Sequence, residues 1–433
     1  MASPAPRVAA TVAIETHGCK LNQADSAALA RELKALGYTL VPDGEAADVY
    51  VVNSCTVTHI ADRKARHALR AARRRNPNAT IVATGCYAQR APDDLRRLVE
   101  VDLVVGNADK PTLARRIADR CGESPVPCAV GAEEVALSPR ALRTRAMVKI
   151  QEGCDQVCAY CIVPKVRGRE RSVPPEHVLA QIRRYVSDGY KETVLTGTQL
   201  GTYGFDLPSI NLAGLVRRIL SETDIARLRV SSLQPQEMNG ELLALWSDPR
   251  LCPHFHVPLQ SGSDAVLKRM RRRYTARQYA DAVSRVRAGL PYASITADVI
   301  CGFPGETDGL FEETLALCRE VGFADLHVFP FSARPGTSAV HFDGHVDADA
   351  KAMRVAALMA LAQQQAADFR DGLLGQTRPV LWEERERGEH GLWSGLTDNY
   401  VRVVCDSGVP LSNRLTAARL VERRGEEVRA EVG

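Results

Sequence analysis

The sequence predicts an α/β protein with three parts: a parallel-sheet domain, a larger (β/α) barrel and a small all-β domain. Two successive alternations of strand-like and helix-like segments predict the first two parts. A change to short strand-like segments near the C-terminus predicts the third. At 433 residues the chain is long enough to build several separate cores.

The N-terminal part alternates short apolar runs with amphipathic segments. The expected strands are residues 8–15, 48–53, 80–85 and 102–106. Such alternation is typical of a parallel sheet with helices on its faces, as in Rossmann-like domains. We therefore predict a Rossmann-like domain over residues 1–121. A linker rich in Pro, Gly and Glu follows at 122–143.

The central part repeats the alternation on a larger scale. Its strand candidates are residues 146–151, 193–198, 227–232, 254–259, 294–300 and 325–331. Six β/α units predict a partial (β/α)6 barrel over residues 144–374, closed by a long helix at 347–374. In such barrels the active site lies at the carboxyl ends of the strands.

The C-terminal part, residues 375–433, changes to short strand candidates broken by Gly, Asp and Asn. These candidates are residues 380–384, 399–405 and 416–422. A small β-barrel appended to the larger domain is the expected arrangement.

Composition narrows the class of protein. The chain is 45% apolar and 25% charged, and its formal net charge is only +4, so any nucleic-acid surface must come from local clusters of Lys and Arg. No uninterrupted apolar run reaches the length of a membrane span, and the N-terminus lacks a secretory pattern. We expect a cytoplasmic protein with no membrane partner.

Twelve cysteines in a chain without an export signal favour metal binding over disulfides. Half of them are expected to be small buried apolar residues. These are Cys121, Cys128, Cys252, Cys301, Cys318 and Cys405. The other six fall into two sets.

The first set is Cys154, Cys158 and Cys161, which follow the first predicted barrel strand with C-x₃-C-x₂-C spacing. Thiolates bind both zinc and iron–sulfur clusters. A structural zinc site would need a fourth Cys or His at comparable spacing, and none is close by. A 4Fe-4S cluster with one open iron is therefore favoured, and zinc is the alternative.

The second set is Cys19, Cys55 and Cys86, which are far apart in the sequence. Each follows a predicted parallel strand directly. Because the carboxyl ends of parallel strands meet at one edge of a sheet, the three thiols are expected to converge on one metal centre.

These segments together resemble one known family, the methylthiotransferases, which are radical S-adenosylmethionine (SAM) enzymes. The resemblance covers residues 8–422 and includes Tyr160, an aromatic residue before the third cysteine of the first set. The motifs are GCKLN, NSCTVT, TGCYAQ, EGCDQVCAYCIVPKVRGRERS, LTGTQLGTYG, HVPLQSGSDAVLKRMRRRYT, DVICGFPGET and FPFSARPGT. They look most like the branch that modifies N6-threonylcarbamoyladenosine beside the tRNA anticodon. Sister branches modify N6-isopentenyladenosine in tRNA or an aspartate of a ribosomal protein.

The resemblance implies two 4Fe-4S clusters and SAM as cofactors. The cluster on Cys154, Cys158 and Cys161 would cleave SAM to a radical that removes hydrogen from C2 of the adenine. The second set would provide sulfur, which is methylated before delivery. An electron donor such as flavodoxin or ferredoxin is implied, the small barrel resembles a TRAM domain, and DNA is not an expected partner.

Position at strand ends selects candidates for SAM contact. They are Tyr160, Thr196, Gly197, Thr198, Ser231, Gln260, Gly302, Gly305 and Glu306. The segment Gly302–Glu306 is equally typical of a plain turn. Asp298 is interpreted either as a ligand contact or as a hydrogen-bond partner in the core.

Basic clusters select candidates for RNA contact. They are Arg63, Lys64, Arg66, Arg167, Arg169, Arg271, Arg272 and Arg273. Arg167, six residues after Cys161, is alternatively expected inside the pocket. Trp382, Trp393 and Tyr400 would either stack on RNA bases or form the core of the small barrel. A non-catalytic metal- or RNA-binding protein is the remaining alternative.

Overall fold

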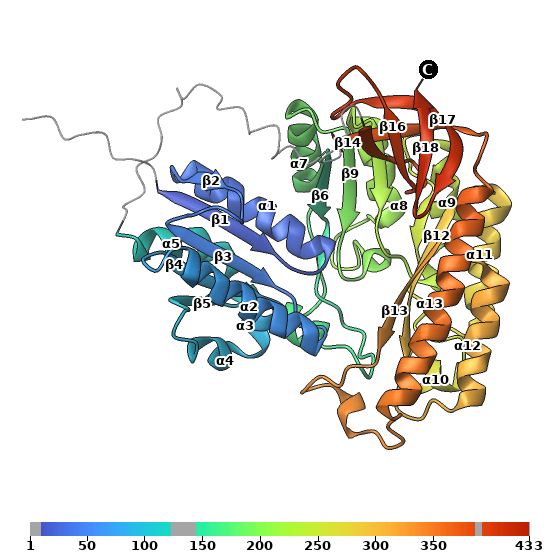
Figure 1. Cartoon of the computed structure of the whole chain (residues 1–433), viewed down its shortest axis with the longest axis horizontal. Coiled ribbons are helices and arrows are strands. Elements are labelled where there is room, and N and C mark those ends of the chain that lie inside the picture. The colour runs from blue at the N-terminus through green and yellow to red at the C-terminus, as the bar shows by residue number, and fades with distance from the viewer. Residues whose placement is uncertain (1–9, 123–143, 386–391, 433) are drawn as a thin grey trace, which may run out of the picture. The chain divides into compact units, whose positions relative to one another are not determined.

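The computed structural model describes residues 10–122, 144–385 and 392–432 (Figure 1). The described chain divides into two compact units. The first contains the residues up to 122 together with Gly153–Asp155 and Cys161–Arg169, and the second contains the rest. The predicted linker lies, apart from Gly122, outside the described residues. The domain boundaries expected from the sequence therefore stay predictions.

The first unit is built on a parallel five-stranded sheet of order β2-β1-β3-β4-β5. Its strands are β1 (Thr11–Thr16), β2 (Thr39–Val41), β3 (Val49–Ser54), β4 (Thr80–Gly85) and β5 (Leu103–Val105). The central strand β3 is buried along its whole length, as a parallel strand covered on both faces requires. The sequence missed only β2, a three-residue strand at the edge.

Helices cover both faces of this sheet. They are α1 (Lys20–Ala35), α2 (His59–Arg75), α3 (Cys86–Arg90), α4 (Pro92–Arg96), the 3₁₀ turn η1 (Asn107–Thr112) and α5 (Leu113–Arg120). Leu33 of α1 and Ile117 of α5 pack on one face, against Val51. Leu69 of α2 and Leu95 of α4 pack on the other. The two-sided covering confirms the Rossmann-like prediction.

The second unit contains six parallel strands in two sheets, of orders β10-β9-β6 and β11-β12-β13. The strands are β6 (Arg145–Lys149), β9 (Glu192–Thr196), β10 (Arg227–Val230), β11 (His254–His256), β12 (Ser294–Cys301) and β13 (Asp325–Pro330). A parallel bridge between Leu228 and Leu251 links the two sheets. The partial (β/α)6 barrel expected from the sequence is therefore confirmed.

Helices pack against the outer face of these strands. The main ones are α7 (Pro175–Ser187), α8 (Leu212–Glu222), α11 (Ala276–Gly289), α12 (Asp308–Val321) and α13 (Ala348–Asp371), the last lying beside β13 (Figure 1). Short elements fill the loops: β7 (Gln151–Glu152), α6 (Val163–Arg167), β8 (Arg171–Ser172), η2 (Leu200–Thr202), η3 (Pro235–Glu237), α9 (Gly240–Leu243), η4 (Ala244–Ser247), α10 (Asp264–Arg269) and η5 (Ser338–His341). No helix among the described residues has the length and apolar character needed to cross a bilayer.

The C-terminal strands close into a barrel of order β14-β15-β16-β18-β17. They are β14 (Thr377–Arg385), β15 (Leu392–Thr397), β16 (Arg402–Asp406), β17 (Leu415–Arg424) and β18 (Glu427–Val432). Trp382 is fully buried, and its Nε1 donates to Thr416 Oγ1 at 2.8 Å. Trp393 packs against the same core, so these two residues follow the core alternative.

This barrel is docked at the amino ends of the strands of the second unit. Arg227 of β10 donates to the backbone oxygens of Leu396 and Thr397 at 3.1 and 3.0 Å. Arg229, two residues later, donates to Asp398 O at 3.0 Å. Because β10 begins at Arg227, the carboxyl ends of the strands lie at the opposite end from this interface.

Candidate metal centres and cofactor site

The structure brings Cys19, Cys55 and Cys86 to the ends of neighbouring strands. Cys19 is the N-cap of α1, three residues beyond Thr16 at the end of β1. Cys55 directly follows β3, and Cys86 is the first residue of α3, directly after β4. Since β1, β3 and β4 are adjacent, the three residues occupy one edge of the sheet.

Glycines before the cysteines allow this close approach. A Cβ on Gly18 would lie 2.6 Å from the Cys55 Cβ, and one on Gly85 would lie 2.4 Å from Ser54 O. Both glycines also have a positive φ, which side-chain-bearing residues rarely adopt. Any larger residue at either position would push the cysteine segments apart.

The electrostatics of this trio suit a cationic centre. Burial, with smaller contributions from the neighbouring Cys86 and Cys19, raises the pKa of the Cys55 thiol to about 12. Asn107 Nδ2 donates to Cys86 Sγ at 3.5 Å. A metal centre binds cysteine as the thiolate, so metal binding would overcome this resistance of Cys55 to ionisation. The residues therefore fit a cluster held by cysteine sulfur.

Cys154, Cys158 and Cys161 lie in one loop between β7 and α6. Gly153 lets this loop pass close to Arg169, because a Cβ there would lie 2.0 Å from Arg169 O. The Cys154 amide donates to Gly168 O at 3.2 Å. Ile162, beside Cys161, forms an apolar cluster with Cys86 in the first unit.

The remaining cysteines follow the sequence prediction where the structure describes them. Cys252, Cys301, Cys318 and Cys405 are buried, and Cys121 is partly buried. Cys128 lies outside the described residues. Their role as apolar packing residues is confirmed for the four buried ones.

Arg167 holds α6 against α1 within the first unit, which corrects its prediction as an RNA contact. Its side chain is only 2% exposed and lies 2.8 Å from Asp25 Oδ2. It also donates to Asn22 Oδ1, and Lys110 Nζ lies 2.7 Å from the same Asp25 oxygen. A guanidinium buried in this way has no access to a phosphate. The burial of Arg167 therefore fits the alternative interpretation, in which its side chain acts inside the protein.

Arg272 also departs from its prediction as an RNA contact. Its Nη1 donates to Cys158 Sγ at 3.4 Å, and its Nη2 donates to Gln234 Oε1 at 3.2 Å. Burial opposes its charge, but Tyr274, Tyr160 and Cys158 hold its pKa above the ordinary value. The Arg272 guanidinium therefore stays charged in direct contact with the Cys158 sulfur.

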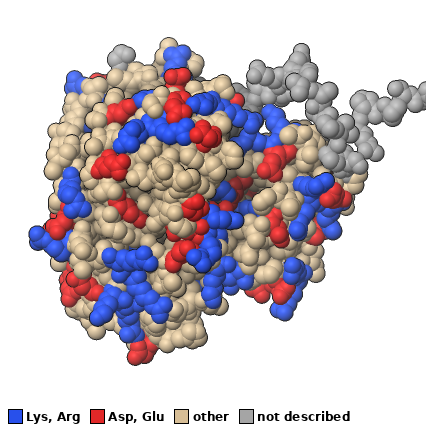
Figure 2. Space-filling view, turned by 180° about the vertical axis from the view of Figure 1, so that it is seen from behind, with Lys and Arg blue, Asp and Glu red and all other residues tan. Residues whose placement is uncertain are grey.

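The other predicted RNA contacts lie nearer the surface. Arg63, Lys64, Arg169, Arg271 and Arg273 are exposed. Arg66 is partly buried and donates to Tyr87 OH at 2.8 Å, and Arg169 pairs with Asp155 at 2.8 Å. On the face in Figure 2, basic side chains form several groups interleaved with acidic ones.

The predicted SAM contacts occupy the carboxyl ends of successive strands in the second unit. Thr196 ends β9, and Ser231 directly follows β10. Gln260 follows β11 with a φ of +66°, and its backbone N–H donates to the backbone oxygen of Asp298 at 2.7 Å. Tyr160 packs edge-on against Phe303, with ring centroids 6.4 Å apart.

The loop after β9 has features that suit a bound ligand. Gln151 Oε1 accepts from the amides of Thr198 and Gln199 at 2.8 and 2.9 Å. A Cβ on Gly197 would lie 2.9 Å from this oxygen. The Thr198 hydroxyl is buried without a hydrogen-bond partner among the described residues, so it is available to a cofactor.

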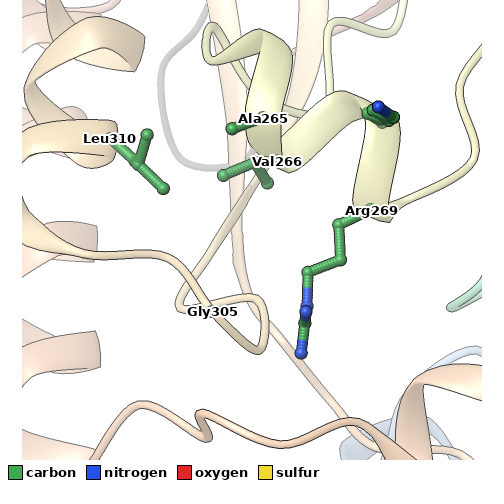
Figure 3. A pocket seen from close by; sticks show the side chains of 6 residues that line it. Ala265, Val266, Arg269, Gly305 and Leu310 are labelled. Carbon is green, nitrogen blue, oxygen red and sulfur yellow. The ribbon is translucent and has the colours of Figure 1, made fainter.

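The loop of Gly302 and Glu306 is stabilised by a buried ion pair. Glu306 Oε1 accepts from Gly302 N at 2.8 Å and pairs with Arg354 at 2.7 Å. The Glu306 carboxylate is thus committed to holding the turn, which supports the plain-turn interpretation for this residue. Figure 3 shows a pocket of about 510 Å³ beside Gly305, lined also by Ala265, Val266, Lys268, Arg269 and Leu310. Of the predicted SAM contacts, only Gly305 lines it.

Sequence reasoning missed a polar network at the ends of β9 and β10. Glu237 Oε2 accepts from Gln234 N at 2.8 Å, and Glu237 Oε1 accepts from Gln199 Nε2. Gln234 Nε2 also donates to Gln156 Oε1 in the cysteine loop at 3.2 Å. Burial raises the Glu237 pKa to about 7. The signal was the run of Gln and Glu after each strand, in LTGTQ and SSLQPQE.

Comparisons with known proteins agree with this architecture. The model described as "Uncharacterized protein family UPF0004" matches residues 11–106, and the radical SAM superfamily model matches residues 148–318. The chain is 38% identical to the threonylcarbamoyladenosine tRNA methylthiotransferase MtaB of Bacillus subtilis, covering 95% of this chain and 94% of the relative. It is also 38% identical to the tRNA-2-methylthio-N(6)-dimethylallyladenosine synthase of Acidothermus cellulolyticus, covering 89% and 80%.

A solved structure supports the fold. The radical SAM methyltransferase TsrM of Kitasatospora setae, with cobalamin and a [4Fe-4S] cluster bound, superposes with a TM-score of 0.55. The match covers 77% of each chain at 14% identity. At this identity it bears on the fold alone.

Proposed function

The chain belongs to the radical SAM methylthiotransferase family, and from this premise we propose that it converts N6-threonylcarbamoyladenosine in tRNA to its 2-methylthio derivative. It is a transferase, and its family uses SAM and 4Fe-4S clusters. One observation carries the proposal: a trio of cysteines at one sheet edge is combined with a C-x₃-C-x₂-C loop in the same chain.

Separate sets of residues in the chain would bind the two clusters and SAM. Cys154, Cys158 and Cys161 would hold the cluster that binds SAM, and the second trio, Cys19, Cys55 and Cys86, would hold the other. When bound, these groups supply the radical that removes a hydrogen atom and the sulfur and methyl group that replace it. Thr198 would orient SAM through its unpartnered hydroxyl, and Arg272 would hold the Cys158 side chain in place through its contact with the sulfur.

The RNA substrate would be held by the exposed basic residues and the C-terminal barrel. Arg63, Lys64, Arg169, Arg271 and Arg273 remain candidates for phosphate contact. Cytoplasmic localisation and a flavodoxin- or ferredoxin-type electron donor complete the proposal. Because tRNA is recognised largely through phosphates, binding should weaken steeply as salt concentration rises.

The second candidate substrate is N6-isopentenyladenosine in tRNA, favoured by the equal identity to a dimethylallyladenosine synthase. Purified enzyme supplied with SAM, a reductant and tRNA carrying one or the other modification separates the two. Mass spectrometry of the digested nucleosides should show a 2-methylthio product only from the threonylcarbamoyl substrate. A product only from the isopentenyl substrate would assign the chain to the sister branch.

Cluster roles are tested by two triple variants. Anaerobically reconstituted enzyme should contain about eight irons. Alanine at Cys154, Cys158 and Cys161 should leave about half of the iron and stop SAM cleavage. Alanine at Cys19, Cys55 and Cys86 should also halve the iron but permit SAM cleavage while abolishing the methylthio product. Methylthio product from this second variant would exclude the sulfur-donor role.

A further inference from the structure

A group of three side chains that includes no cysteine lies on the inner face of the sheet β11-β12-β13. Asp298 Oδ2 lies 3.2 Å from His256 Nε2, and Asp298 Oδ1 lies 3.0 Å from His327 Nδ1. One ligating atom from each residue lies within 4.8 Å of the others. They come from three neighbouring strands of the barrel.

The strand register places these residues on one face. Asp298 pairs with His327 across β12 and β13, and His256 pairs with Thr296, two residues before Asp298. Residues two apart on a strand point to the same side. The alternate residues Phe255, Ala297 and Val299 belong to the core beneath the helices, so the His–Asp–His face is the one turned toward the barrel interior.

We propose that His256, Asp298 and His327 bind one divalent transition-metal ion, such as Zn(II). Two imidazoles and one carboxylate form a donor set that suits first-row divalent metals. Metal–ligand bonds of about 2.0–2.2 Å place neighbouring ligand atoms about 2.8–3.6 Å apart, between octahedral and tetrahedral geometry. The observed separations of 3.0 and 3.2 Å match that spacing.

The surroundings of both histidines support metal binding. Metal-bound imidazoles usually engage a second group through their other nitrogen. His256 Nδ1 lies 2.9 Å from Thr296 Oγ1, and His327 Nε2 lies 3.8 Å from Asp325 Oδ2. When His256 donates from Nδ1 to Thr296, its Nε2 lone pair faces the Asp298 carboxylate, and a cation between them relieves that repulsion.

Access to the site is also suitable. The His256 side chain is 12% exposed, Asp298 29% and His327 52%, so an ion can enter past His327. The ion would tie three strands together and keep coordination positions for water or for an oxygen of a ligand.

The test uses full-length enzyme with both clusters reconstituted, so that the six cluster cysteines are occupied. Equilibrium dialysis against Zn(II), with metals measured by mass spectrometry, should give about one zinc per chain in addition to the iron. His327→Ala should lose this zinc. His177→Ala, an exposed histidine on α7, is the matched control and should keep it. Thr296→Val should weaken binding by about tenfold or more, because it removes the partner of His256.

Two further measurements keep the proposal falsifiable. Iron content and circular dichroism establish that each variant is folded. If His327→Ala does not fold, Asp298→Asn replaces it as the variant that should lose zinc. X-ray absorption at the zinc edge should show nitrogen and oxygen ligands. Sulfur ligands, an unchanged zinc content in His327→Ala, or no zinc in the wild-type enzyme would each overturn the proposal.

Discussion

A carboxylate buried at the start of β9 stabilises the interface between the C-terminal barrel and the strands of the second unit. Glu192 is fully buried and lies 2.7 Å from Arg227 and 3.0 Å from Arg229. Both guanidiniums also donate to backbone oxygens of the barrel, at Leu396 and Asp398 among others. Replacing Glu192 with Gln removes the charge that keeps these two arginines in place.

The surroundings of Glu192 determine how much stability the Glu192→Gln substitution should remove. Burial alone would raise the Glu192 pKa, but Arg229 and Arg227 lower it from 4.5 to about 2. Because the folded pKa is depressed, this stabilisation is complete above pH 4.5 and is lost as the pH falls toward 2. The difference corresponds to about 3 kcal/mol. Breaking a buried ion pair by removing one partner costs about 3–5 kcal/mol, which agrees.

Hydrogen exchange measures this loss locally, at neutral pH and with both clusters bound. In Glu192→Gln the amides of β15 and β16 should exchange about a hundredfold faster, which corresponds to about 3 kcal/mol. Glu176→Gln is the matched control, because its pair with Arg218 lies at the surface, and it should leave exchange unchanged. Equal exchange in the wild-type enzyme and Glu192→Gln would refute the role of the buried carboxylate.

Two other carboxylates give further predictions. Glu237→Gln should flatten the pH dependence of thermal stability. Burial raises the pKa of Glu237 to about 7 in the wild-type enzyme. As the pH rises from about 4.5 to 7, the wild-type enzyme should therefore lose up to about 3 kcal/mol of unfolding free energy that the variant keeps. Parallel melting curves across this range would contradict the burial argument. Asp25→Asn leaves Arg167 and Lys110 buried without their shared anion, and it should lower the unfolding free energy by about 3–5 kcal/mol. Calorimetry at neutral pH checks this, and an unchanged melting temperature would show that the pair contributes nothing.

The sequence predicted those features of the structure that depend on residues close together along the chain. Buried parallel strands appear as apolar runs such as DVYVVN, so nearly every strand of the first two sheets could be placed, and their carboxyl ends located the cysteines. β15 was missed because LWSGLT lacks an apolar alternation, whereas β18 was missed although EVRAEV alternates charged and apolar residues as a half-buried strand does. Strands of a small closed barrel are specified partly by their neighbours, which the local pattern does not show.

The partners of buried charges could not be predicted from the sequence. Arg167 bonds to Asp25 across 142 residues, and Arg272 reaches Cys158 across 114. A local window shows only a basic residue in a basic run, for which a phosphate contact is the ordinary interpretation. The joining of Cys161–Arg169 to the first unit is likewise a result of folding.

Arg167 and Arg272, which the sequence assigned to RNA contact, show that basic residues near the cysteine motifs can lie inside the protein. The guanidinium that would bind a phosphate at the surface can instead contact a cysteine sulfur inside the protein. Arg272 contacts Cys158 directly, and in the first unit the buried Lys110 interacts with Cys86, since this thiol helps to offset the lowering of the Lys110 pKa by burial. Some of the basic residues in the sequence therefore lie inside the protein, beside cysteine side chains. The short basic run Arg271 to Arg273 alternates exposed and half-buried positions, so its two outer arginines remain candidates for RNA contact.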